Sequence, residues 1–254
     1  MDNVLFAFIL TTIAGLSTMI GTIPIFFRKK TDKIIISSLA FAAGVMITVS
    51  ITDLIPHSFS LLSNIYKIIP NILYILIFIV VGIIFSMLID KFLPDNFEQN
   101  NTLNKKGLYR VGIISMVAII IHNIPEGIAT FMATNVNRSL GISLAFAITM
   151  HNIPEGISIS VPIYYATGSR VKAIFYTFIS GTSELFGAIL AYFFLSNFIN
   201  DKIMGFLFSI IAGIMGHIAI YELLPQSKKY NNLKLTYLFF FIGVLFMIFN
   251  HFVL

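Results

Sequence analysis

Apolar and polar residues follow one another along this chain in long blocks. Eight mainly apolar runs each reach the length of about 20 residues that a helix needs to cross a bilayer. The pattern predicts an all-α integral membrane protein with eight transmembrane helices and no soluble module, so that residues 1–254 form a single transmembrane domain. The helices are expected over about 4–27, 34–55, 71–93, 111–132, 139–163, 171–194, 203–224 and 235–254.

The composition agrees with a membrane protein. Hydrophobic residues make up 57% of the chain, charged residues 11%, and 26 residues are Phe, which is more apolar surface than a soluble globule can bury. The first apolar run is too long for a signal-peptide core and no basic residue precedes it, so we expect it to stay as a spanning helix. Because the chain has no Cys, nitrogen and oxygen donors would hold any metal.

The basic residues indicate a topology. The formal net charge is +5, but Lys and Arg lie in loops between apolar runs, so we expect no nucleic-acid partner. When loops are assigned alternately to two sides, the positive-inside rule makes the more basic side cytoplasmic. Both termini of this multi-pass cell-membrane protein then lie outside, and the polar segment 94–110 is a cytoplasmic loop. The cytoplasmic side holds 13 of the 16 basic residues, namely Arg28, Lys29, Lys30, Lys33, Lys91, Lys105, Lys106, Arg110, Arg170, Lys172, Lys228, Lys229 and Lys234.

A six-residue stretch, His-Asn-Ile-Pro-Glu-Gly, occurs at 122–127 and again at 151–156, each time inside an apolar run. Its His and Glu are four residues apart, so they share a helix face with the neighbouring Asn. Pro125 and Pro154 cannot donate to the carbonyl four residues back, which predicts a kink and a free carbonyl at each copy. The candidate metal ligands of the two copies are His122, Asn123, Glu126, His151, Asn152 and Glu155.

These ligands are expected near the middle of the membrane. At about 1.5 Å per residue, His122, His151 and Glu184 lie roughly 16, 18 and 20 Å from the starts of their helices. An ionised acid at that depth costs about 2.5 to 3.5 kcal/mol. The central parts of the runs contain no Lys or Arg, so bound divalent cations or protons must compensate Glu126, Glu155 and Glu184. A purely structural pair of proline kinks would leave Glu184 uncompensated.

The donor set suits Zn²⁺, with Fe²⁺, Mn²⁺, Co²⁺ and Cd²⁺ as alternatives. Seven donors exceed the four or so that one Zn²⁺ uses, so we infer two adjacent sites bridged by Glu126 and Glu155.

A weaker internal repeat relates residues 53–58 to residues 222–227. Both segments consist of an acid, two aliphatic residues, Pro, a polar residue and Ser, in that order. The two helices run in opposite directions, which predicts inverted repeats of helices one to three and six to eight flanking a central hairpin of helices four and five. Asp53 and Glu222 are either solvated helix-end acids or the entrance and exit of an ion path.

Three histidines lie outside the repeated motif. His217 either makes an interhelical hydrogen bond or contacts a proton or a metal. We interpret His57 and His251 as interfacial residues rather than ligands.

Together these motifs resemble the ZIP family of divalent metal transporters, and in particular its prokaryotic zinc-uptake branch, over nearly the whole chain. The resemblance implies a 3+2+3 arrangement of eight helices, a binuclear centre between helices four, five and six, and metal movement into the cytoplasm. The chain departs from its relatives at two positions. Relatives often carry an acid at the position of Tyr221 and a small or apolar residue at the position of His217. Besides the tandem motif, the resemblance rests on residues 41–46, 165–169, 180–184, 212–215 and 222–225.

The resemblance also implies how the ligands are shared between two ions. One metal would use Glu126, His151 and Glu155 together with His122. The adjacent metal would use Asn123, Glu126, Asn152, Glu155 and Glu184.

The leading hypothesis is a secondary transporter that takes up Zn²⁺, with Fe²⁺ and Mn²⁺ as further cargo, and that has no catalytic residue and no catalytic cofactor. Its partners would be divalent metal ions and the lipid bilayer, and glycine-lined helices would allow a homodimer. The alternative is an intramembrane zinc-dependent hydrolase in which the same ligands hold a water. The lack of a His-Glu-x-x-His helix counts against it. A metal sensor would need a signalling domain.

Overall fold

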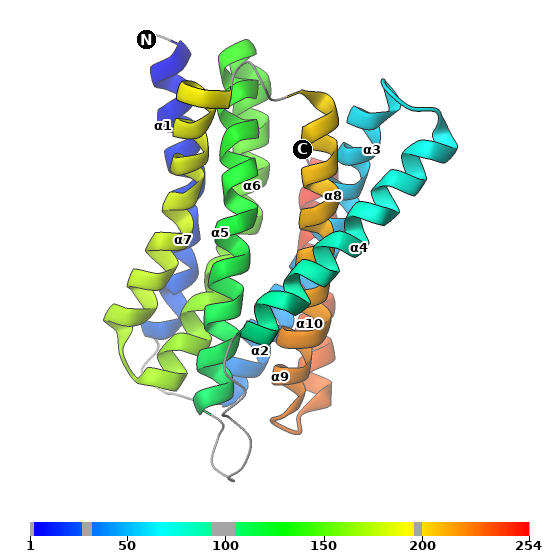
Figure 1. The fold of residues 1–254 in the computed structure, drawn as a ribbon. Helices are drawn as coiled ribbons and strands as arrows, with labels where there is room; N and C mark the ends of the chain where they lie inside the picture. The colour runs from blue at the N-terminus through cyan, green and yellow to red at the C-terminus, as the bar shows by residue number, and fades with distance from the viewer. Residues whose placement is uncertain (1–2, 27–31, 93–104, 196–199, 254) are drawn as a thin grey trace.

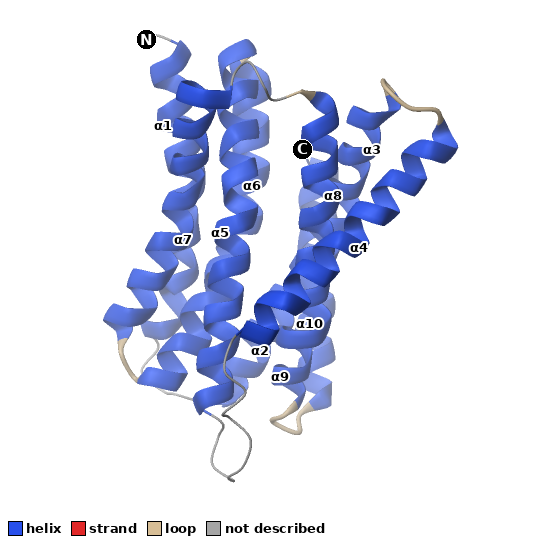
Figure 2. Cartoon of the chain, in the orientation of Figure 1, coloured by secondary structure: helices blue, strands red, loops and turns tan. Residues whose placement is uncertain are grey.

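The computed structural model describes residues 3–26, 32–92, 105–195 and 200–253. All regular elements of this part of the chain are helices, and Figure 2 shows no strand among them. The long helices run up and down side by side (Figure 1). The all-helical class predicted from the sequence is therefore confirmed.

The helices follow the predicted apolar runs closely. Within the described residues they are α1 (Asn3–Leu16) continued by the 3-10 helix η1 (Ser17–Phe26), α2 (Asp32–Val49) continued by the π-helical turn η2 (Ser50–Leu54) and α3 (Ile55–Ser63), α4 (Ile68–Phe92), α5 (Lys105–Val136), α6 (Arg138–Thr167), α7 (Arg170–Leu190) continued by the π-helical turn η3 (Ala191–Leu195), α8 (Asp201–His217) continued by the π-helical turn η4 (Ile218–Leu223) and α9 (Leu224–Lys228), and α10 (Leu233–Val253).

Seven described helical segments are long and apolar enough to cross a membrane. The 30-residue helix α6, which carries the polar residues of the second motif copy, is not among them. The seven segments are Asn3–Phe26, Asp32–Ser63, Ile68–Leu88, Gly107–Asn135, Arg170–Phe194, Asp201–Lys228 and Leu233–Phe252.

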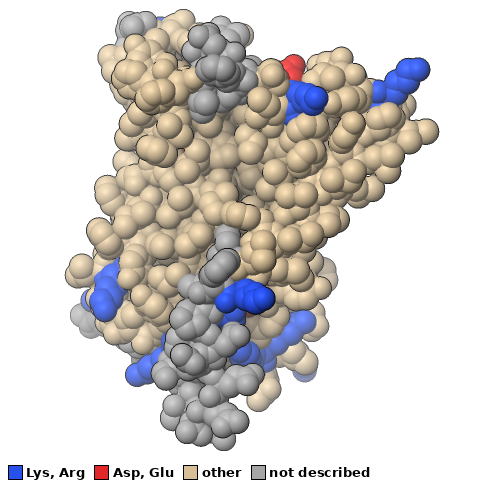
Figure 3. Space-filling view, viewed as in Figure 1, with Lys and Arg blue, Asp and Glu red and all other residues tan. Residues whose placement is uncertain are grey.

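The charged side chains agree with a membrane position. On the face drawn in Figure 3, Lys and Arg gather at the lower end and a few charges lie at the upper end, with an uncharged band between them. The first residues of α5 and α7 lie at the more basic end in Figure 1.

Two sequence boundaries were wrong. The second helix does not end at residue 55, because α3 continues it to Ser63. Of the predicted loop 94–110, residues 94–104 lie outside the described residues, and residues 105–110 form the first turns of α5. A hydropathy window detects only the apolar part of a helix, so it misses polar turns that extend beyond the bilayer.

Prolines affect the helices in two ways. The π turns η2 and η4 each end two residues before a proline, Pro56 and Pro225. A proline ring clashes with the carbonyl four residues back, and a π bulge widens the turn in which that clash would occur. By contrast α5 and α6 are helical without a break through Pro125 and Pro154. The kinks and free carbonyls expected there stay predictions.

The helices form two groups (Figure 1). The first group consists of α1, η1, α5, α6 and α7, and the second consists of α2, α3, α4, α8, α9 and α10. Within them the closest pairings are α5 with α6 and α7, α2 with α10, and α4 with α8. The two groups meet mainly where α2 packs on α6 and α5 packs on α8.

Paired glycines hold helices together inside each group. A Cβ at Gly82 would lie 2.0 Å from the carbonyl oxygen of Ile210, and one at Gly213 would lie 2.1 Å from that of Ile79. Only glycine permits such backbone contact. No such contact of a described glycine joins one group to the other. Five pairs of described glycines lie at such reciprocal helix crossings, namely Gly15 with Gly181, Gly21 with Gly156, Gly44 with Gly243, Gly82 with Gly213, and Gly127 with Gly187.

Candidate metal centre

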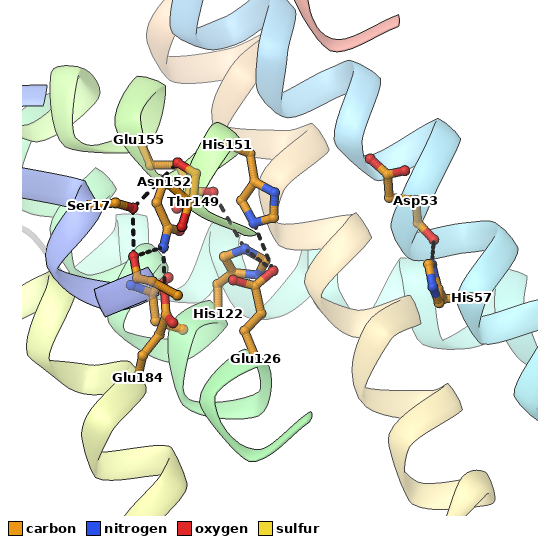
Figure 4. Close-up of polar contacts among 12 residues, drawn as sticks. Ser17, Asp53, His57, His122, Glu126, Thr149, His151, Asn152, Glu155 and Glu184 are labelled. Atoms are coloured by element: carbon orange, nitrogen blue, oxygen red, sulfur yellow. Dashed lines mark hydrogen bonds and ion pairs between the residues drawn. The ribbon is translucent and has the colours of Figure 1, made fainter. Parts of the chain in front are cut away.

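The two copies of the repeated motif face each other between α5 and α6. His151 Nε2 lies 3.0 Å from Glu126 Oε1, and His122 Nε2 lies 3.1 Å from the same oxygen. His122 Nε2 is also 3.4 Å from Glu155 Oε1. All four side chains are buried, and ligand atoms of His122, His151 and Glu155 lie within 4.8 Å of one another (Figure 4).

The local sequence explains this alignment. Asn137 is the only residue between the end of α5 and the start of α6. His122 is 15 residues before this turn and His151 is 14 residues after it, so the antiparallel helices bring the two imidazoles to the same level. In each copy the His and Glu are one turn apart on one face, which puts both carboxylates beside the imidazoles.

Glu184 of α7 is connected to the cluster through Asn152. The Asn152 side-chain amide donates to Glu184 Oε1 and, over 2.9 Å, to the carbonyl oxygen of Ala14. The Asn123 amide donates to the carbonyl oxygen of Ser180 over 3.1 Å. With both amide nitrogens used in this way, the Oδ1 atoms of Asn123 and Asn152 have no hydrogen-bond partner among the described residues. These oxygens are free to bind a cation.

Unpaired polar atoms gather at this place. A buried polar atom without a hydrogen bond costs about 1 to 3 kcal/mol, and a charged one costs more. A divalent cation would satisfy these donors at once, so the residues present fit a metal. The unpaired atoms of the described cluster are His122 Nδ1, Asn123 Oδ1, Glu126 Oε2, Asn152 Oδ1, Glu155 Oε2 and Glu184 Oε2. His122 Nε2 and Glu155 Oε1 have only the ion-pair contacts given above.

A cavity of about 310 Å³ lies between the two helix groups and reaches the cluster. Glu126 and His151 line its inner end, and Phe208 of α8 lines its wall. Asp53 and His251 line its outer end, where their side chains are 29% and 47% exposed. The cluster is thus accessible from the end of the molecule where α5 and α6 are joined.

The outer end of the cavity contains two histidines that the sequence placed at the membrane interface. His251 Nδ1 lies 3.0 Å from Asp53 Oδ1, and His57 Nδ1 lies 2.8 Å from the backbone oxygen of Asp53. Figure 4 shows Asp53 and His57 apart from the Glu126 cluster. The spacing of four between Asp53 and His57 could have drawn attention to His57, but no sequence signal joined His251 to Asp53 across 198 residues.

Apolar side chains close the other side of the cluster. Ile119 lies one turn before His122 on α5, and Ile159 lies one turn after Glu155 on α6. Both are buried in a large apolar core to which α2 and α8 contribute, for example through Met46 of α2. In the described structure the cluster is therefore accessible from the cavity on one side and closed by packed apolar side chains on the other.

Two candidate path residues lie elsewhere. His217 Nδ1 lies 2.9 Å from Ser86 Oγ of α4, and its ring stacks on Tyr221 at 4.9 Å between centroids. Of the two alternatives for His217, the interhelical hydrogen bond is the one observed. Glu222 is in the π turn η4, and neither Glu222 nor His217 is among the residues that line the cavity.

Comparison with known proteins agrees with this arrangement. Residues 98–251 match the family model described as ZIP Zinc transporter. The chain belongs to the ZIP family. Its relatives in this family include the zinc transporter ZupT of Clostridium perfringens, 44% identical over 91% of this chain and 89% of the relative. Those of Chlorobium chlorochromatii and Streptococcus mutans are also 44% identical, over 90% and 88% of both chains.

Membership in the ZIP family decides between two of the hypotheses. The family is one of transporters, so this multi-pass membrane protein is not an enzyme and the intramembrane hydrolase is set aside. The tandem motif is what identified the family in the sequence, and in the structure it supplies the buried His and Glu residues that could hold a metal.

Proposed function

We propose that this ZIP-family protein takes up Zn²⁺ into the cytoplasm as a secondary transporter, with Fe²⁺, Mn²⁺, Co²⁺ and Cd²⁺ as further possible cargo. One observation carries the proposal: the Glu126 carboxylate of the first motif copy contacts His151 of the second at the buried end of an open cavity. The ZupT relatives are named zinc transporters, which supports zinc as the main substrate.

In this proposal the cluster holds two ions. The first binds His122, Glu126, His151 and Glu155, whose nitrogen and oxygen atoms suit Zn²⁺. The unpaired oxygens support a neighbouring ion on the Glu184 side, and the Oε2 atoms of Glu126 and Glu155, which have no hydrogen bond, support the bridging role proposed for these two residues. The second ion binds Asn123, Glu126, Asn152, Glu155 and Glu184.

The proposed topology has eight crossings, with α6 as the eighth and both termini outside. At about 1.5 Å per residue the 30-residue helix α6 is roughly 45 Å long, enough to cross a bilayer. Its motif residues His151, Asn152 and Glu155 are buried in the cluster rather than exposed to lipid, so the helix can cross although it carries them. The lysines and arginines at one end of the molecule support the orientation.

Inverted repeats are supported by two matching features. The π turns η2 and η4 occupy equivalent places before Pro56 and Pro225. Gly44 lies nine residues before Asp53, and Gly213 lies nine residues before Glu222. Each glycine lies where its helix crosses another helix of the same group, α2 with α10 and α8 with α4. An approximate two-fold relation in the membrane plane would produce this pairing and would permit access from either side.

The proposed path enters at Asp53, passes the cavity to Glu126 and His151, and leaves toward Glu222 and His217 after a conformational change. The cavity lies between the two helix groups, whereas the glycine contacts lie within them. Relative movement of the two groups would therefore change access without breaking the closest helix packing.

Zinc uptake by purified protein in liposomes tests this function. A zinc-sensitive dye inside the vesicles should report uptake that protein-free vesicles lack and that excess external chelator stops. If the vesicles show no zinc flux while the protein is folded, the proposed transport function is wrong.

A further inference from the structure

Ser180 differs from the other hydroxyl residues of α7. Thr177 and Thr182 donate to backbone oxygens one turn back, over 2.8 and 2.9 Å, and Ser183 donates to the backbone oxygen of Ser180. These bonds are the usual way in which a helix satisfies a buried hydroxyl. Ser180 Oγ has no hydrogen-bond partner among the described residues, although the residue is 0% exposed.

Ser180 lies next to the oxygen-rich side of the metal cluster. Its backbone oxygen accepts the Asn123 amide, and Glu184 follows it by one turn on the buried face of α7. Glu184 in turn accepts the Asn152 amide. The unpaired atoms of these four side chains are all oxygens, whereas the other side of the cluster includes the two imidazoles.

We propose that the Ser180 hydroxyl oxygen is a further metal ligand, which completes an all-oxygen subsite with Asn123, Asn152 and Glu184 for hard divalent cations such as Mn²⁺. This inference rests on the proposed transport function and deepens it. Carboxylate, carbonyl and hydroxyl oxygens suit Mn²⁺, whereas imidazole suits Zn²⁺. Ser180 therefore influences which metal is favoured, and the imidazole side of the cluster keeps its preference for Zn²⁺.

The absence of Cys from the chain permits a direct test, because Ser180→Cys introduces the only thiol of the protein. When Cd²⁺ binds to that sulfur, the thiol loses its proton to solvent and a cadmium–thiolate bond forms, with an ultraviolet charge-transfer band. The matched control is Ser183→Cys, which is buried on the same helix and whose native hydroxyl is bonded to the Ser180 backbone. We expect the band on titrating full-length Ser180→Cys protein in detergent with Cd²⁺, and no band with Ser183→Cys.

Ser180→Ala gives a second measurement that does not depend on a new thiol. We expect its affinity for Mn²⁺, measured by equilibrium dialysis, to fall about ten-fold or more while its affinity for Zn²⁺ changes little, as for the loss of one supporting contact at a metal site. Ser183→Ala should bind both ions as the wild type does.

The inference is overturned if Ser180→Cys gives no cadmium–thiolate band, or if Ser180→Ala binds Mn²⁺ as the wild type does. Its failure is distinct from that of the transport function, because wild-type vesicles are assayed for zinc uptake in parallel. Zinc uptake by the wild type without any effect at Ser180 removes only the role of Ser180.

Discussion

Glu126 Oε1 lies 3.0 Å from His151 Nε2, so the carboxylate of one motif copy contacts the imidazole of the other. The same oxygen is 3.1 Å from His122 of its own copy. The buried His and Glu side chains of the two copies come together where α5 and α6 pack on each other. In the proposed metal site, the repeat supplies two half-sites from antiparallel helices.

Zinc should stabilise the folded protein. A ligand that binds only the native state at about 100 times its Kd adds about 2.7 kcal/mol to the free energy of unfolding. We expect the wild type to unfold at a higher temperature with Zn²⁺ than with EDTA, and Glu126→Gln to lose most of this difference. Heating followed by size-exclusion chromatography measures it. An equal zinc effect in Glu126→Gln would show that the stabilising ion binds elsewhere.

The glycine contacts predict a sharp difference between two positions on α8. A methyl group at Gly213 would meet the Ile79 backbone at 2.1 Å, whereas one at Gly216 would meet nothing within 4 Å. Gly213→Ala should lower the free energy of unfolding by about 1 to 3 kcal/mol through overpacking. Gly216→Ala should be neutral or slightly stabilising, because Ala favours helix.

The same heating assay compares the two glycine variants. If Gly213→Ala and Gly216→Ala unfold at the same temperature, the close crossing of α4 and α8 does not hold the second helix group together.

The mouth of the cavity predicts a kinetic effect. Asp53→Asn removes the negative charge nearest the exposed end of the cavity, where Asp53 contacts His251. Because negative charge at a cleft raises the local concentration of a cation, we expect a several-fold higher KM for zinc uptake with a nearly unchanged maximal rate. Asp201→Asn, at an exposed acid outside the cavity, is the control. An unchanged KM in Asp53→Asn would exclude this entrance.

The sequence predicted much of the fold because its signal was local. Apolar runs located the helices, and the motif spacing placed His122 and His151 at one level before any contact was known. The hydropathy window ended the second helix at residue 55, whereas a π turn accommodates Pro56 and the helix continues to Ser63. A proline alone does not reveal whether a helix ends, kinks or bulges.

What the sequence could not supply was contact between distant residues. The pairing of Asp53 with His251 depends on how α2 packs on α10, and no periodicity encodes it. Likewise the sequence does not distinguish the unpaired hydroxyl of Ser180 from the hydrogen-bonded hydroxyls of Thr177 and Ser183. Only the hydrogen bonds in the three-dimensional structure distinguish them.

Radiolabelled zinc uptake by liposomes containing His151→Ala, Glu155→Ala or wild-type protein tests the central claim most directly. Ser143→Ala, which changes a cavity residue without a role as ligand, serves as the matched control. We predict that the two site variants lose uptake at equal protein content, because each removes a donor from the shared site, and that the control retains it. Zinc uptake by both site variants at the wild-type rate would contradict a transport site built from the two motif copies.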